Sequence, residues 1–110
     1  MKQTCTAAEV KAYAKLGPTG VNRLESLKAV PDRFPSNDDS IGIELVGAAL
    51  APPKAGAEPE YETVTDAQNA SLKWLIGELS MLLGVPFTEV FRHPQVSRKN
   101  MTEASTAKWQ

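Results

Sequence analysis

The clearest pattern of apolar positions lies in residues 40–47, which read Ser-Ile-Gly-Ile-Glu-Leu-Val-Gly. Four isoleucine, leucine or valine residues fall within six positions between polar or glycine flanks, and this pattern predicts a buried strand. Alternation along a strand places Ile41, Ile43 and Leu45 on one face and Glu44 on the other. A carboxylate in an apolar strand is costly unless it is paired, hydrogen-bonded or near a metal, so Glu44 is the first candidate functional residue.

The residues before this strand predict one short helix. Thr6 and Glu9 have the spacing of a capping box, and the helix that they open is expected to continue through Leu16, before a Gly-Pro pair. The following pattern is weaker, and residues 21–30 are compatible with either a helical turn or an extended segment. Three basic residues in this part of the chain are expected to be solvated surface: Arg23, Lys28 and Arg33.

The residues after the strand predict a long loop, a helix and a second strand. Residues 48–62 are rich in Ala, Pro and Glu and lack periodicity, which is typical of a loop. Thr65 and Gln68 form a second capping box, and apolar residues at spacings of three and four predict a helix through Leu83. Residues 88–93 resemble a short strand, so the order strand, helix, strand predicts a crossover within one sheet.

Composition limits the classes of protein to which the chain can belong. Its 110 residues are enough for one domain with a modest core. Twelve basic and thirteen acidic residues give a formal charge of -1, which gives no indication of nucleic-acid binding. No apolar run is long enough for a membrane span. A single cysteine, Cys5, excludes an internal disulfide.

Three residues could carry chemistry, and each also has a structural interpretation. His93 is the only histidine, and a lone histidine is more often a hydrogen-bonded structural residue than a metal ligand. Glu44 could be a buried carboxylate paired with Arg92 or Lys99, and Glu103 could be an exposed acid in a loop. One histidine with carboxylates is a weak zinc signal, because catalytic zinc sites commonly have three protein ligands.

The combination of these residues with the sequence around them indicates a particular protein family more specifically than any one residue does. Residues 37–47, Asn-Asp-Asp-Ser-Ile-Gly-Ile-Glu-Leu-Val-Gly, resemble the central strand of the type 2 N-acetylmuramoyl-L-alanine amidases, which include AmpD-like enzymes and peptidoglycan recognition proteins. The resemblance continues to residue 109 through six positions in the family's order: Tyr61, Thr65 and Gln68 at the helix start, then His93, Glu103 and Trp109. It implies an α/β fold, a mixed β-sheet flanked by helices that lacks the first strands. Residues 37–110 would be the C-terminal part of the amidase-like domain, and residues 1–36 an N-terminal helix and irregular segment of the same single domain.

The resemblance also implies a reaction and its residues. His93 and Glu103 match the positions of the second and third zinc ligands, and Glu44 matches the glutamate that acts as general base. The substrate would be peptidoglycan or a muropeptide, and Zn²⁺ would assist hydrolysis of the amide bond between N-acetylmuramic acid and L-alanine. The family's usual lysine two residues before the third ligand is replaced by Met101, so Lys99 or Arg98 is the candidate for stabilising the developing oxyanion.

One departure from the family's pattern leaves three hypotheses for the function of the chain. The family's first zinc ligand is a histidine on an earlier strand, and no histidine precedes His93. This implies that the chain is the C-terminal part of an amidase domain. A second hypothesis is a non-catalytic module that binds peptidoglycan or muropeptides. A third is an α/β domain in which Glu44 and His93 have structural roles.

Overall fold

The computed structural model describes residues 1–2, 4–96 and 100–110. The described residues form two compact units. The N-terminal unit contains Met1–Gly42 with Gln95 and Val96, and the C-terminal unit contains Ile43–Pro94 and residues 100–110.

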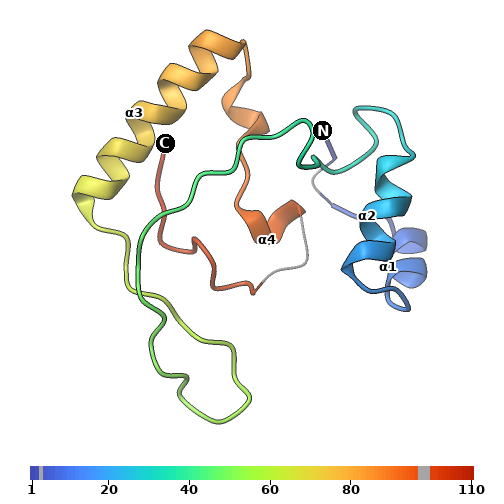
Figure 1. The fold of residues 1–110 in the computed structure, drawn as a ribbon, viewed down its shortest axis with the longest axis horizontal. Coiled ribbons are helices and arrows are strands. Elements are labelled where there is room, and N and C mark those ends of the chain that lie inside the picture. The colour runs from blue at the N-terminus through green and yellow to red at the C-terminus, as the bar shows by residue number, and fades with distance from the viewer. Residues whose placement is uncertain (3, 97–99) are drawn as a thin grey trace. The chain divides into compact units, whose positions relative to one another are not determined.

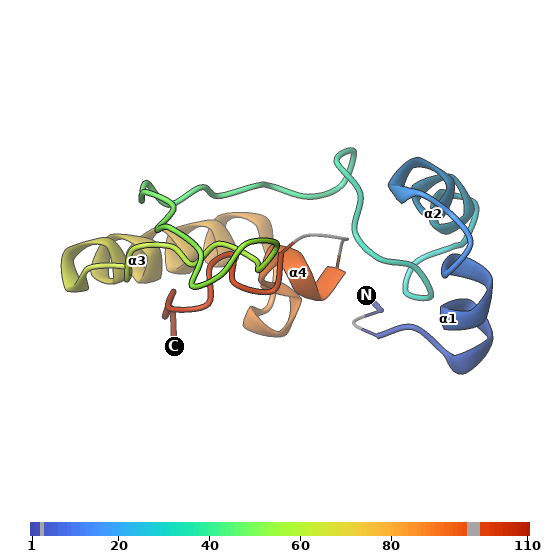
Figure 2. The same cartoon turned by 90° about the horizontal axis from the view of Figure 1, so that it is seen from below.

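The N-terminal unit is built on two short helices, α1 (Ala7–Tyr13) and α2 (Pro18–Ser26), which lie side by side in Figures 1 and 2. The predicted capping box of α1 is confirmed, because the side chains of Thr6 and Glu9 each accept a hydrogen bond from the other's backbone N–H. The helix ends at Tyr13, before the predicted end at Leu16. None of its residues is buried, so no packing contact in a core stabilises a further turn. Proline in the first turn of α2 suits a helix start, and residues 18–26 are helical.

The C-terminal unit is organised by the long helix α3 (Asp66–Leu83), which confirms the predicted helix. Thr65 and Gln68 form the predicted capping box at its start. Gly84 ends the helix with a φ of 67°, a left-handed conformation that glycine adopts without a steric penalty.

The core of this unit is small and lies along one face of α3. Leu72 and Ile76 are buried with Ala107 of the C-terminal segment. Partly buried apolar side chains pack around them: Leu45, Val64, Val90 and Trp109. The C-terminal segment is fixed to α3 and to the residues before it by two hydrogen bonds, from the N–H of Val64 to Thr106 Oγ1 (3.0 Å) and from the N–H of Lys108 to Asn69 Oδ1 (2.8 Å).

The segment predicted to be a long loop, residues 48–62, lies within the C-terminal unit, and its two ends are paired. Ala49 and Tyr61 form an isolated antiparallel bridge. Two backbone hydrogen bonds close the loop, from Leu50 N–H to the carbonyl of Glu60 (2.7 Å) and from Glu62 N–H to the carbonyl of Ala48 (3.0 Å). The loop prediction is therefore confirmed, with paired ends (Figure 1).

The predicted α/β fold is wrong. Over the described residues the structure is helical, and its only β-pairing is the bridge between Ala49 and Tyr61. Residues 40–47 are in no strand, and Val46 is 91% exposed. A strand needs a neighbour to take its backbone hydrogen bonds, and no second strand lies beside this segment among the residues described.

The predicted second strand is also absent, which removes the crossover. Phe87–Glu89 forms a 3₁₀ turn, η1, and His93–Val96 forms a single helical turn, α4. Local hydrogen bonds replace strand pairing here: the N–H of Glu89 donates to the carbonyl of Pro86 (2.9 Å) and that of Val90 to the carbonyl of Phe87 (3.2 Å). The turn that follows Pro86 therefore determines the local structure here, and the apolar pattern of residues 88–93 does not produce a strand.

Candidate functional site

The C-terminal unit brings together two of the residues that the sequence singles out. His93 Nδ1 lies 4.0 Å from Glu103 Oε2, although ten positions separate the two residues in the chain. The side chain of His93 is 54% exposed and that of Glu103 is 29% exposed, so solvent and ions reach both. We call these two residues the His–Glu pair.

Arg92 holds the two segments that carry this pair. It precedes His93 and donates hydrogen bonds to two carbonyls in the segment after Glu103, from Nε to Ala104 (3.1 Å) and from Nη2 to Ala107 (2.7 Å). The centre of its guanidinium also lies 4.6 Å from the ring centroid of Trp109. A guanidinium presents several donors in a fixed plane, which allows it to bridge two carbonyls at once.

The segment around Glu103 is held on its other side by the loop of residues 48–62. Thr102 Oγ1 donates to the carbonyl of Pro59 (2.7 Å), and the N–H of Met101 donates to Glu58 Oε2 (3.2 Å). Ala104 follows with a φ of 55°, which is unfavourable for a residue with a Cβ, and it lies in a turn that includes Glu103. Contacts on both sides therefore fix the backbone that presents the Glu103 carboxylate.

The remaining predicted site residues are not part of this pair. Glu44 is exposed on the extended segment of the C-terminal unit. Lys99, with Arg98, lies outside the described residues. No three histidine, cysteine, aspartate or glutamate side chains in the described part of the chain are grouped closely enough to hold one metal ion.

The His–Glu pair is chemically suited to contribute two zinc ligands. Imidazole nitrogen and carboxylate oxygen both bind Zn²⁺, at about 2.0–2.2 Å. Two such donors on a tetrahedral ion would be roughly 3.3 Å apart, so the observed 4.0 Å needs only a small side-chain adjustment. The pair would supply two of the three protein ligands that a catalytic zinc site commonly has.

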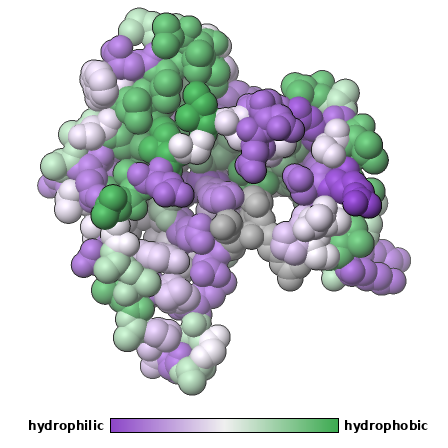
Figure 3. Space-filling view, viewed as in Figure 1, coloured by the Kyte–Doolittle hydropathy of each residue, from purple (hydrophilic) through white to green (hydrophobic). Residues whose placement is uncertain are grey.

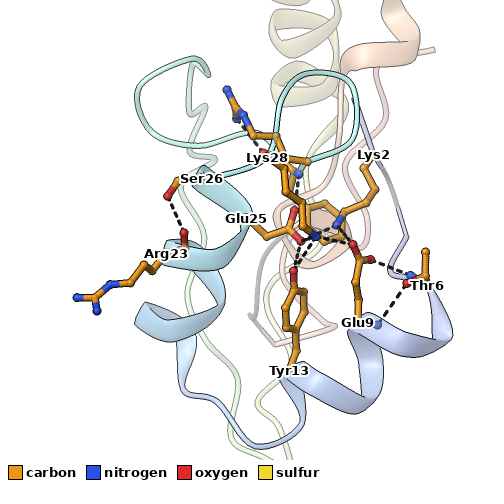
Figure 4. Close-up of polar contacts among 10 residues, drawn as sticks. Lys2, Thr6, Glu9, Tyr13, Arg23, Glu25, Ser26 and Lys28 are labelled. Atoms are coloured by element: carbon orange, nitrogen blue, oxygen red, sulfur yellow. Dashed lines mark hydrogen bonds and ion pairs between the residues drawn. The ribbon is translucent and has the colours of Figure 1, made fainter.

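A second cluster of charged side chains lies in the N-terminal unit, and the sequence analysis missed it. Glu25 on α2 is only 4% exposed and accepts hydrogen bonds from Lys2 Nζ (2.5 Å), Lys28 Nζ (2.8 Å) and the hydroxyl of Tyr13. Glu9 on α1 accepts from the same two lysines, at 3.0 Å and 2.5 Å. Figure 4 shows the side chains converging between the helices. We call this group the charge cluster.

The charge cluster shifts the ionisation of its members. Burial raises the pKa of Glu25, but hydrogen bonds from Lys2, Lys28 and Tyr13 outweigh burial and hold the pKa at about 2. Hydrogen bonds from Lys28, from the N–H of Thr6 and from Lys2 lower the pKa of Glu9 to about 2. Hydrogen bonds to Glu25, Glu9 and Tyr13 raise the pKa of Lys28 above its ordinary value. These pairings keep the cluster ionised at neutral pH.

This cluster corrects a prediction for two basic residues. The side chain of Lys28 is 31% exposed and belongs to the charge cluster, and that of Arg33 is 16% exposed and pairs with Asp39 (2.5 Å). The prediction of solvated surface was therefore wrong for both, whereas Arg23 is exposed. The three-residue spacing of Glu25 and Lys28 was the only local signal of the cluster.

Comparison of the chain with protein family models, with curated proteins and with solved structures finds no match. Among the described residues, no helix combines the length and apolar character needed to cross a membrane.

Proposed function

We propose that this chain carries part of a zinc-dependent amidase centre that acts on peptidoglycan, with the His–Glu pair as two of the zinc ligands. The observation that carries the proposal is the 4.0 Å approach of His93 Nδ1 to Glu103 Oε2. The sequence resemblance had singled out these two residues on independent grounds, from their order and spacing around the Ile-Gly-Ile-Glu motif.

The residues have distinct roles in this proposal. When bound, Zn²⁺ would supply Lewis-acid polarisation of the scissile carbonyl and activation of water. The sequence resemblance assigns the role of general base to Glu44, which would accept a proton from the attacking water and deliver it to the leaving amine. The exposure of Glu44 leaves its carboxylate accessible to a substrate of polymeric size. Arg92 is a positioning residue, because it fixes the backbone beside both ligands.

The number of protein ligands determines how tightly zinc is expected to bind. Catalytic zinc sites usually have three protein ligands, and the described residues supply two that lie together. We expect zinc to bind with one-to-one stoichiometry and more weakly than at structural zinc sites, which contribute about 10–16 kcal/mol.

Calorimetric zinc titration with parallel release assays on purified peptidoglycan tests the proposal. The wild-type chain is compared with His93→Ala, Glu103→Gln and the control Glu78→Gln, which removes an exposed carboxylate from α3. Loss of zinc binding in the first two variants alone, with zinc-dependent release of muropeptides by the wild type, supports the amidase centre. Muropeptide binding without zinc binding would instead favour the non-catalytic module, and equal zinc binding by all four proteins would overturn the proposed ligands.

A further inference from the structure

The side of α3 that faces away from the core of the C-terminal unit is apolar and exposed. Leu72 and Ile76 on the inner side of the helix are buried. At 3.6 residues per turn, the opposite side carries five residues, which we call the outer face: Ala67, Ala70, Trp74, Gly77 and Met81. Trp74 is 66% exposed and Met81 is 75% exposed, and Figure 3 shows hydrophobic side chains gathered over the C-terminal end of α3. Exposed apolar surface of this kind indicates an interaction site.

The outer face has the seven-residue repeat of a two-stranded coiled coil. Ala67, Trp74 and Met81 occupy the a positions, and Ala70 and Gly77 occupy the d positions. In a parallel coiled coil, each a side chain enters a hole between residues of the facing helix, which include the d residues before and after it. The large ring of Trp74 would therefore lie between two small residues, Ala70 and Gly77, of a second copy.

Gly77 provides space for such a contact in the middle of the helix. Glycine destabilises a helix interior relative to alanine. A Cβ at this position would meet no atom of a neighbouring side chain or segment within 4 Å among the described residues. Packing within the described part of the chain therefore does not require a glycine here, whereas close packing of a second helix against Trp74 does.

The charged residues beside the outer face are complementary between two parallel copies. Lys73 and Glu78 are both exposed, and they lie on opposite flanks of this face at the g and e positions. In a parallel pair, a g residue lies beside the e residue five positions later in the other helix, so Lys73 of each copy meets Glu78 of the other. An antiparallel pair places e beside e and g beside g, which brings like charges together.

We infer that two copies of this chain associate through parallel α3 helices that pack by their outer faces. Each copy contributes one helix of 18 residues, so the interface belongs to the small class, below about 1,200 Å² in total, that is typical of weak association. We expect a dissociation constant of about 100 μM. The inference does not depend on zinc binding or on amidase activity, because the His–Glu pair lies on other segments.

Sedimentation equilibrium of the purified chain between about 10 μM and about 1 mM tests the association. The wild type should change from monomer to dimer over this range, and Trp74→Ala should remain monomeric. Val46→Ala, which shortens a 91% exposed side chain elsewhere in the same unit, should associate as the wild type does. Circular dichroism verifies that each variant is folded. A wild-type chain that is monomeric at about 1 mM, or a Trp74→Ala protein that associates equally well, would overturn the inference.

Charge reversal tests the parallel arrangement. Lys73→Glu and Glu78→Lys should each weaken self-association by about tenfold, because each converts both attractive pairs of the dimer into repulsive ones. An equimolar mixture of the two variants should associate at least as tightly as the wild type, because both pairs are attractive again. Lys54→Glu makes the same change in net charge at an exposed loop position and should have no effect. Unchanged self-association of the two single variants, or a mixture that associates no better than either alone, would overturn the inference.

Discussion

His93 Nδ1 and Glu103 Oε2 lie 4.0 Å apart at the point where two segments of the C-terminal unit meet. Arg92 joins these segments through the carbonyls of Ala104 and Ala107. The two candidate ligands are therefore neighbours of residues that the fold itself holds in place. A preformed arrangement of this kind lowers the conformational cost of binding an ion.

Replacing Arg92 with glutamine should destabilise the C-terminal unit and weaken zinc binding together. The variant loses two hydrogen bonds to carbonyls and the contact with the Trp109 ring, which we expect to cost about 1–3 kcal/mol of unfolding free energy. Urea denaturation measures the stability and calorimetry the zinc affinity.

Arg23→Gln is the control for this variant, because Arg23 is exposed on α2. It should change neither quantity. An Arg92→Gln protein that is less stable but binds zinc as the wild type does would show that Arg92 supports the core and does not position the ligands.

Glu44→Gln separates metal binding from bond cleavage. Glu44 lies outside any three-ligand group among the described residues, so its amide variant should retain zinc binding. It should lose zinc-dependent muropeptide release, because glutamine cannot accept the proton of the attacking water. Release at the wild-type rate by Glu44→Gln would rule out the proposed general base.

Removing the hydroxyl that caps α3 should weaken the C-terminal unit. Thr65→Ala eliminates the acceptor for the N–H of Gln68, and loss of such a cap typically costs about 1 kcal/mol. Chemical denaturation should show this change, whereas Thr63→Ala, at an exposed position before the helix, should be neutral. Equal effects of the two substitutions would contradict the assigned cap.

Acid should destabilise the N-terminal unit through the charge cluster. Glu9 and Glu25 have pKa values of about 2, below the ordinary value of 4.5. A carboxylate with a lowered pKa in the folded state stabilises the fold above its unfolded pKa, so this contribution is complete above pH 4.5 and is lost as the pH falls toward about 2. Amide hydrogen exchange in α1 and α2 between pH 6 and pH 3, corrected for intrinsic rates, measures this loss.

Glu25→Gln should remove much of that pH dependence and destabilise the N-terminal unit at neutral pH. The substitution leaves Lys2 and Lys28 with Glu9 as their one carboxylate partner, and loss of the charged hydrogen bonds to Glu25 should cost about 1.5–3 kcal/mol. Glu60→Gln, in the loop of the C-terminal unit, is the matched control. Unchanged protection of α1 and α2 in Glu25→Gln would argue against a stabilising cluster.

Sequence patterns formed by residues a few positions apart predicted the helix starts correctly. Features that depend on contacts between distant segments were predicted wrongly or missed. The capping boxes at Thr6 and Thr65 gave both helix starts, because a cap depends on residues three positions apart. The α/β fold failed because residues 40–47 find no partner strand among the described residues, and pairing cannot be read from one segment alone. The charge cluster was missed because Lys2 and Glu25 meet only through the tertiary fold.

The candidate site was predicted in part. The resemblance to the amidase family singled out His93 and Glu103, which lie 4.0 Å apart, but gave no reason to expect Arg92 beside them as a bridge between carbonyls.

Zinc titration of the wild-type chain beside His93→Ala and Glu103→Gln tests the central claim most directly. We predict one-to-one binding by the wild type and at least a tenfold loss of affinity in each variant. The loss in the double variant should be smaller than the sum of the two single losses in free energy, because the two side chains share one ion. Wild-type affinity in either single variant would contradict the claim that His93 and Glu103 hold the same metal.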